Sequence, residues 1–274
     1  MRTKTVLALS LLAAAATLPL AAETKPKPPG SMRLYVFNCG TIKAMSVTRY
    51  GFKEGEVAPR DFVVTCYLVV HPKGTLMWDV GLTPDAALKP DSPTMPLKAQ
   101  LAAVGYAPSD ISYLAMSHYH SDHTANANDF APATWIVQKA ERDAMFADQP
   151  ARIMAPATFS ALKNSKTKIL VNEDYDVFGD GKVIVKSAPG HTPGHQVLFL
   201  KFKKDGNMLL AGDLYHFPEE QTLNRFPTFE FNVPQSAASR AAIDEFLKKN
   251  KARMWISHDL ATYEKAKKSP QYYE

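Results

Sequence analysis

Apolar positions recur along the chain in short runs that favour β-strands. Such runs predict strands at 34–37, 62–70, 75–79, 111–116, 134–137, 168–171, 183–186, 196–202, 208–211 and 254–256. Wider spacing of apolar positions predicts helices at 97–104, 139–147 and 236–249, and a helix start at 124–128. In the helix at 139–147, the charged residues Glu141, Arg142 and Asp143 are expected to face outward. Two blocks of strands with attached helices predict two sheets packed face to face, with helices outside.

One polar segment stands out against this pattern. Residues 117–123 lie between a predicted strand and a predicted helix, and they contain three of the eight histidines in the chain, His118, His120 and His123, together with Asp122. A strand-to-helix turn lets such closely spaced side chains converge, and neutral imidazole with carboxylate suits zinc and similar divalent metals. Four ligands are too many for one tetrahedral zinc that also holds a water molecule. The segment therefore predicts two metal ions, each short of ligands.

The missing ligands are expected at the ends of strands further along the chain. The segment 190–195, Gly-His-Thr-Pro-Gly-His, forms a tight turn that can offer one histidine. Asp213 follows Gly212 at the end of an apolar run, where a carboxylate can bridge two cations. His258 follows the last predicted strand. Each of these signals is weak alone, and their order along the chain carries the argument.

The first 22 residues predict a secretory signal peptide rather than part of the fold. Arg2 and Lys4 give a positive start, a largely apolar run follows, and small residues end the segment. The protein is therefore expected to be exported, either to the periplasm or out of the cell, with a retained anchor as the alternative. No later apolar run is long enough to cross a bilayer, so stable membrane insertion is not expected. Residues 23–32 read as a flexible leader, and 33–274 as a single domain.

Charge and cysteine content add little to this picture. The formal net charge of +5 falls to +3 when Arg2 and Lys4 leave with the signal peptide, and the basic residues are scattered, so nucleic-acid binding is not expected. Cys39 and Cys66 are the only cysteines. In an exported protein they can form a disulfide, but two buried thiols fit the sequence equally well. Neither lies near the histidine segment in sequence, so neither is given a catalytic role.

From Leu34 to His258 the chain resembles the metallo-β-lactamase superfamily, with the H-x-H-x-D-H unit at 118–123 as its most specific feature. The resemblance implies an α+β fold, a four-layer αβ/βα sandwich of two mixed sheets, with the site at one edge of both. It implies that Asp79, in an acid–x–glycine strand end, supports the ligands. His191 and His71 are expected to be structural. The implied ligands are His118, His120 and His195 for the first metal, Asp122, His123 and His258 for the second, and Asp213 as the bridge.

Within that superfamily, the segments 190–199, 212–213 and 257–259 look most like those of the N-acyl homoserine lactone lactonases. The implied activity is quorum quenching by opening of the lactone ring. Two divalent cations, with zinc expected, would lie roughly 3.5–4 Å apart and make hydroxide available for attack on the carbonyl carbon. Asp122 is a candidate to carry a proton to the leaving group. The expected partner is a small lactone or ester, and a homodimer stays open.

The chain departs from the lactonases after the bridging aspartate. Those enzymes often carry a tyrosine three residues later, whereas here Tyr215 comes two residues after Asp213 and His216 three. Either Tyr215 or His216 is therefore a candidate hydrogen-bond donor to the substrate. The nearby phenylalanines are expected mainly in the core, although some can line an acyl-chain groove. These are Phe217, Phe226, Phe229 and Phe231.

Other activities share much of this ligand set. A phosphotriesterase of the methyl-parathion-hydrolase type matches both the ligands and the exported form. A β-lactamase is a weaker alternative, because those enzymes usually lack a bridging carboxylate at the position of Asp213. Glyoxalase II also shares the ligands, but the chain has no dedicated glutathione-binding segment after His258. A metal-binding protein without activity is disfavoured, because every implied ligand position is filled.

Overall fold

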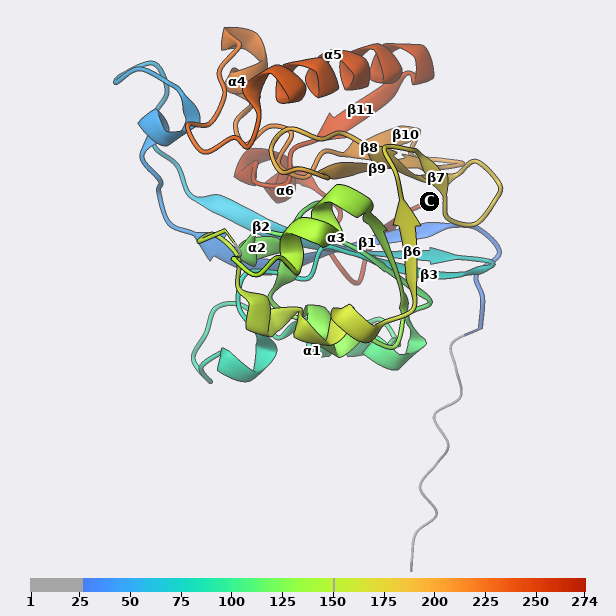
Figure 1. The fold of residues 1–274 in the computed structure, drawn as a ribbon. Helices are drawn as coiled ribbons and strands as arrows, with labels where there is room; N and C mark the ends of the chain where they lie inside the picture. Colours follow the sequence, from blue (N-terminus) through green and yellow to red (C-terminus); the bar gives the residue numbers. More distant parts are fainter. Residues whose placement is uncertain (1–26, 150) are drawn as a thin grey trace, which may run out of the picture.

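The computed structural model of the protein describes residues 27–149 and 151–274 (Figure 1). The predicted signal peptide lies outside these described residues, as does part of the predicted leader. The remaining chain builds two β-sheets. The larger sheet has the order β12-β1-β2-β3-β4-β5-β6 and the smaller has the order β11-β10-β9-β8-β7. The strands of the larger sheet are β1 (Arg33–Ile42), β2 (Phe62–His71), β3 (Gly74–Trp78), β4 (Tyr113–Ala115), β5 (Thr134–Gln138), β6 (Thr167–Leu170) and β12 (Tyr272–Tyr273). Those of the smaller sheet are β7 (Tyr175–Asp176), β8 (Val183–Ser187), β9 (Gln196–Lys201), β10 (Asn207–Leu210) and β11 (Ala252–Trp255).

The two sheets face each other across a continuous apolar core. Strand β2 explains why, because all of its residues are buried and its side chains alternate between two different cores. Tyr67 and Val69 point into the core between the sheets, where they join Leu198 and Leu200 of β9. The intervening Leu68 belongs to the core on the other face of the larger sheet. A strand that is apolar on both faces must be covered on both faces, which requires a layered fold.

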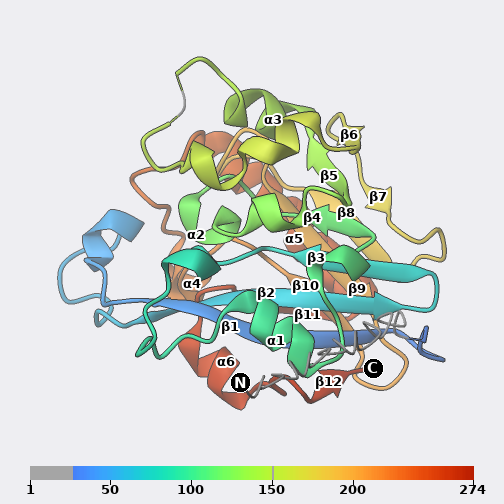
Figure 2. The ribbon, with the colours of Figure 1, turned by 90° about the horizontal axis from the view of Figure 1, so that it is seen from below.

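Helices complete the outer layers (Figures 1 and 2). Leu97 and Leu101 of α1, with Met145 of α3, pack against the outer face of the larger sheet. Ile243 of α5 packs against Val197 of the smaller sheet. The helices are α1 (Leu97–Ala103), α2 (Ser121–Thr124), α3 (Lys139–Met145), α4 (Pro218–Leu223), α5 (Val233–Asn250) and α6 (Leu260–Lys265). Short 3-10 turns occur at Val47–Tyr50, Asp85–Ala87, Pro108–Asp110, Ala127–Phe130, Pro156–Thr158 and Ser160–Asn164.

The predicted α+β sandwich, with two mixed sheets and helices outside, is confirmed. Every predicted strand is present, although the boundaries shift by a few residues. The helix expected to start at 124–128 begins earlier, as α2, and is followed by a 3-10 turn. Strands β7 and β12 and helices α4 and α6 were not predicted, because they are too short to show a hydrophobic period. Met32, at the end of the predicted leader, is buried in the core between the sheets.

No helix within 27–149 or 151–274 combines the length and the apolar character that crossing a membrane requires.

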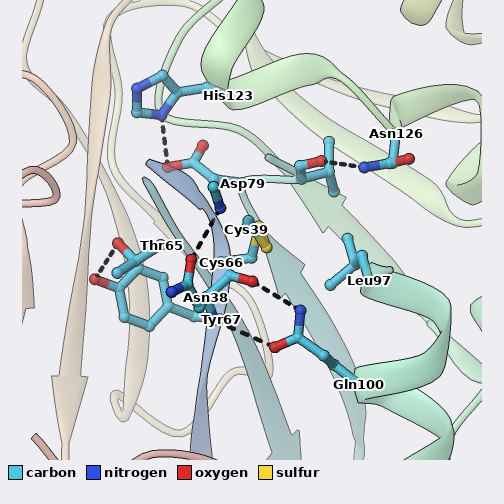
Figure 3. The surroundings of a disulfide bond; sticks show 12 residues. Asn38, Cys39, Thr65, Cys66, Tyr67, Asp79, Leu97, Gln100, His123 and Asn126 are labelled. Atoms are coloured by element: carbon cyan, nitrogen blue, oxygen red, sulfur yellow. Dashed lines mark hydrogen bonds and ion pairs between the residues drawn. A yellow bond between two sulfur atoms is a disulfide. The ribbon is translucent and has the colours of Figure 1, made fainter. Parts of the chain in front are cut away.

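Cys39 and Cys66 form a disulfide between neighbouring strands (Figure 3). Cys39 lies at an irregularity of β1 between Asn38 and Gly40, where the pairing with β2 shifts register. The bond closes a loop with a sequence separation of 27 residues. The side chain of Gln100 in α1 forms hydrogen bonds to the same bulge. It accepts from the amide of Asn38 and donates to the Asn38 carbonyl oxygen at 2.7 Å. Of the two interpretations left open by the sequence, the structure has the disulfide.

We expect the double variant Cys39→Ala/Cys66→Ala to lose about 3–4 kcal/mol of unfolding free energy, because the crosslink no longer restricts the unfolded chain. Denaturant unfolding of the oxidised protein and of the variant measures this difference. Thiol titration of denatured, unreduced protein is the control, and it should find no free thiol. Two titratable thiols would contradict the disulfide.

Candidate metal centre

The ends of strands from both sheets meet at one edge of the sandwich. In the larger sheet, β4 leads through the turn 116–120 into α2. In the smaller sheet, β8 leads into the loop 188–195, β10 ends just before Asp213 and β11 ends just before His258. Gly212 permits this convergence: it has a φ of +52°, and a Cβ there would lie 2.6 Å from Ser117 Cβ. Only glycine allows the two sheets to approach so closely at this point.

The side chains delivered to this edge form two groups that share Asp213. The first group is His118, His120, His191 and Asp213, and the second is Asp122, His123, Asp213 and His258. Within each group the candidate ligand atoms all lie within 4.8 Å of one another.

The two carboxylate oxygens of Asp213 divide between the groups. Asp213 Oδ2 lies 3.6 Å from Nε2 of both His118 and His191. Asp213 Oδ1 lies 3.2 Å from His123 Nε2 and 3.1 Å from His258 Nε2. This is the arrangement of a carboxylate that bridges two cations.

The geometry and the unpartnered atoms fit two divalent cations. Bonds of about 2.0–2.2 Å in tetrahedral geometry place ligand atoms roughly 3.4 Å apart, close to the distances from Asp213 to its imidazoles. Buried polar atoms normally have hydrogen-bond partners. Among the described residues, His118 Nε2, His123 Nε2 and Asp213 Oδ1 are buried and have none. Imidazole nitrogens and carboxylate oxygens without thiolates favour zinc or a similar metal.

Burial and charge prepare these groups to bind cations. Burial lowers the pKa of His118 and of His191 well below the usual histidine value, so both rings are neutral and offer lone pairs at neutral pH. Burial alone would raise the pKa of Asp213, but His258 and His123 outweigh it and hold that pKa well below its usual range. The first group therefore offers an ionised carboxylate beside the neutral imidazoles of His118 and His191.

Further contacts orient the rings. Asp79, at the end of β3, lies 3.1 Å from His123 Nδ1 through its Oδ2 atom, as the acid–x–glycine pattern implied (Figure 3). His258 Nδ1 faces the Val63 carbonyl oxygen at 2.9 Å. His191 Nδ1 faces the buried carboxylate of Glu230 at 3.4 Å. Each of these partners favours a proton on Nδ1 and leaves Nε2 free for a metal.

The structure replaces His195 by His191 in the candidate ligand set. The Nε2 atom of His195 accepts from the Asp213 amide at 3.1 Å, and its Nδ1 atom faces the Ala188 carbonyl oxygen at 3.1 Å. Both ring nitrogens are therefore used by backbone, and no lone pair remains for a metal. His191, which the sequence analysis took as structural, lies in the first group instead.

The other six predicted ligands lie together in the two groups. Of the two candidate hydrogen-bond donors, only one lies at the centre. Tyr215 is buried away from the centre, under Arg240, whose guanidinium carbon lies 4.2 Å from the ring centroid. His216 lies at the centre, with Nε2 3.1 Å from Asp213 Oδ2 and Nδ1 3.4 Å from Glu220. Burial alone would lower the pKa of His216, but Asp213 and Glu220 raise it to about 10. His216 is thus oriented toward carboxylates, whereas Tyr215 takes no part in the site.

A cavity of about 220 Å³ opens directly over the metal-binding groups. Its floor contains Asp122, Asp213 and His258. Its wall is largely apolar and, apart from Phe229, comes from residues that the sequence analysis did not connect with the site. The wall residues are Ile42, Met45, Arg49, Tyr50, Phe62, Leu82, Ile153 and Phe229.

Two irregular segments build much of this wall. The Thr228 amide donates to the Arg49 carbonyl oxygen at 2.7 Å and so joins the segment of Phe229 to that of Tyr50. The Tyr50 ring packs on His216 with a centroid distance of 4.8 Å. The proline-rich loop 84–96 does not line the cavity.

The four phenylalanines considered for an acyl-chain groove lie in different environments. Phe229 lines the cavity, and Phe217 belongs to a neighbouring aromatic core. Phe226 lies under Arg240, and Phe231 is 60% exposed.

Comparison with known proteins agrees with this geometry. A model of the metallo-beta-lactamase superfamily matches residues 59–254. The N-acyl homoserine lactonase AttM of Azorhizobium caulinodans is 28% identical over 261 residues, which cover 89% of this chain and 99% of the relative. An N-acyl homoserine lactonase of Bacillus sp is 29% identical over 233 residues, covering 77% and 87% of the two chains. An N-acyl homoserine lactone hydrolase solved with the product N-hexanoyl-L-homoserine at its catalytic metal center has a TM-score of 0.74 and 25% identity, and the match covers 88% of this chain and 98% of that one.

Replacing the two histidines of the loop 188–195 should separate their roles. His191→Ala removes a ligand, so we expect dialysed protein to retain about one metal equivalent instead of two. His195→Ala leaves the Asp213 amide without an acceptor, so we expect a loss of about 1–3 kcal/mol of unfolding free energy with both metals retained. Elemental analysis and denaturant unfolding measure the two effects. Loss of one metal equivalent in His195→Ala, with both metals retained in His191→Ala, would identify His195 as the ligand instead.

Proposed function

The chain belongs to the metallo-beta-lactamase superfamily as a metal-dependent hydrolase, and from this premise we propose that it opens the lactone ring of N-acyl homoserine lactones. The observation that carries the proposal is the position of the two metal-binding groups, which share Asp213 at the floor of an apolar-walled cavity. A lactone has a polar ring to place at the floor and an acyl chain to place against the wall. Its similarity to proteins named as N-acyl homoserine lactonases supports the same substrate class.

The candidate ligands would hold two divalent cations, and zinc fits their chemistry best. When bound, such a pair lowers the pKa of water and stabilises negative charge that develops on a carbonyl oxygen. Asp213 would keep the two groups in register, because each of its oxygens faces a different group. His216 holds Oδ2 of that carboxylate from the cavity side and is itself held by Glu220.

Two further side chains are placed to act on the substrate. Asp122 directs Oδ2 toward His258 at 3.4 Å and also lines the cavity, where its carboxylate would take up the proton that the attacking water releases and pass it to the leaving alkoxide. Tyr50 also lines the cavity, next to His216. We assign to Tyr50 the donor role that the sequence analysis gave to Tyr215 or His216. Burial raises the pKa of Tyr50, which keeps its hydroxyl protonated and able to donate.

The wall of the cavity suits an acyl chain. Met45, Phe229 and Ile153 offer apolar surface above the metal-binding groups, and Arg49 lies beside Phe229 at the cavity. Burial of each methylene of a substrate chain against such a surface contributes about 0.8 kcal/mol. The amide of the substrate would then lie between the polar floor and the apolar wall.

The test of this function is a substrate panel on protein loaded with zinc. We expect proton release in a pH-stat with N-hexanoyl and N-decanoyl homoserine lactones, and much slower turnover of a phosphotriester, a β-lactam and a glutathione thioester. The ring-opened N-hexanoyl homoserine is the blank. No proton release at any chain length, together with rapid hydrolysis of the phosphotriester or the β-lactam, would move the assignment to that activity.

Tyr50→Phe is the matched variant for the same assay. It removes only a hydroxyl, so metal content should stay at the wild-type value while kcat/KM for the lactones falls roughly tenfold, the equivalent of about 1.4 kcal/mol. Unchanged kcat/KM would remove Tyr50 from the mechanism without affecting the substrate assignment.

We also propose that the protein acts after export, outside the cytoplasm. The predicted signal peptide and the disulfide between Cys39 and Cys66 both support this, because disulfides persist in oxidising compartments. Such a location would let the enzyme degrade lactone signals outside the cytoplasm.

Expression of the full chain in a bacterium, followed by fractionation and N-terminal sequencing, tests the proposal. A mature chain that begins near residue 23 in the periplasm or medium is expected. An intact chain beginning at Met1 and confined to the cytoplasm would contradict it.

A further inference from the structure

Glu141 is a buried carboxylate for which the hydrolytic mechanism has no use. It lies in the first turn of α3, where the sequence analysis expected it to face outward, but only 3% of it is exposed. Its Oε1 atom accepts from the Tyr119 amide at 2.7 Å and its Oε2 atom accepts from the Gly194 amide at 2.7 Å. The Thr192 hydroxyl lies between both oxygens, at 2.9 and 2.8 Å. Among the residues that the structure describes, no lysine, arginine or histidine forms an ion pair with it.

These hydrogen bonds join two segments that carry metal ligands. Tyr119 lies between His118 and His120 on the turn after β4. Thr192 follows His191 directly, and Gly194 ends the same tight turn. One carboxylate therefore links the segments that supply all three histidines of the first group.

The backbone of Gly194 also packs closely against Glu141. A Cβ at position 194 would lie 2.5 Å from the Glu141 amide nitrogen and 2.7 Å from its Cβ. Only glycine lets the loop 188–195 approach α3 closely enough to donate to the carboxylate. Burial of a carboxylate without a cation is costly and raises the pKa of Glu141 to about 7, and the hydrogen bonds that it accepts offset part of that cost. The three donors are therefore what holds the carboxylate in place.

We propose that Glu141 is a positioning residue that clamps the His191 segment onto the His118–His120 turn and thereby sets the metal affinity of the first group. The second group has no ligand in the loop 188–195 and shares only Asp213 with the first. Loss of the clamp should therefore weaken one metal much more than the other. This inference rests on the metal-binding part of the proposed function and is independent of the lactone substrate.

The test is the metal affinity of Glu141→Gln. Glutamine keeps the shape of the side chain, but its amide nitrogen cannot accept a hydrogen bond, so either the Tyr119 or the Gly194 amide loses its acceptor. Competition with a chromophoric chelator, with zinc and with cobalt, gives the two affinities of the full-length protein without any turnover assay. We expect one affinity to fall 10–100-fold and the other to change by less than about threefold.

Changes at Thr192 provide matched controls. Thr192→Ser keeps the hydroxyl and should bind both metals as wild type does. Thr192→Val removes the hydroxyl but leaves both backbone donors. Its affinity for the more weakly bound metal should therefore lie between the wild-type and the Glu141→Gln values. Thr192→Val also carries the test if Glu141→Gln does not fold.

The outcomes separate this inference from the proposed function. Wild-type affinities in both Glu141→Gln and Thr192→Val, with only a lower melting temperature, would show that Glu141 merely stabilises the fold. Equal weakening of both metals would likewise overturn the selective clamp. Two metals in the wild type with no lactone turnover would remove the lactonase assignment and leave the clamp standing. Fewer than two metals in the wild type would overturn both.

Discussion

The site depends on one carboxylate whose two oxygens serve different groups of imidazoles. Asp213 follows β10 in the smaller sheet, while His118, His120 and His123 follow β4 in the larger sheet. Its position is therefore correct only when the two sheets are packed in one register. The apolar core between the sheets, with β2 apolar on both faces, maintains that register. The cost of burying so many polar groups at the edge is met by cations that the same groups attract.

Residues around the centre hold the ligands in position. Several of the imidazoles have a partner at the second ring nitrogen, such as Asp79 for His123 and Glu230 for His191. The turns that carry the ligands are themselves fastened, by Glu141 on one side and by Gly212 at the closest approach of the sheets. The ligands are thus set by backbone and packing before any metal binds, which is what a preorganised site requires.

The sequence was sufficient for the layered fold and for most of the site, because strand-end ligands follow long apolar runs that are easy to recognise. It failed where the answer depends on contacts across the fold. His191 and His195 lie in one turn, and only the Asp213 amide, 18 residues later, decides which ring is free. The sequence pattern places Glu141 on the surface of its helix, but in the folded chain the loop at Gly194 packs on it and buries it. Tyr50 lies in a short 3-10 turn with no hydrophobic period, so the sequence did not connect it with the site. A backbone hydrogen bond between Thr228 and Arg49 joins this turn to the segment of Phe229, whose place in the core or the groove the sequence left open.

X-ray absorption at the zinc edge tests the central claim most directly. For protein loaded with zinc, the account predicts nitrogen and oxygen ligands only, together with a zinc–zinc distance of about 3.5–4 Å. That distance is expected when both groups, which share Asp213, hold a cation. A spectrum of isolated zinc with no zinc–zinc scattering, or one with sulfur ligands, would contradict it.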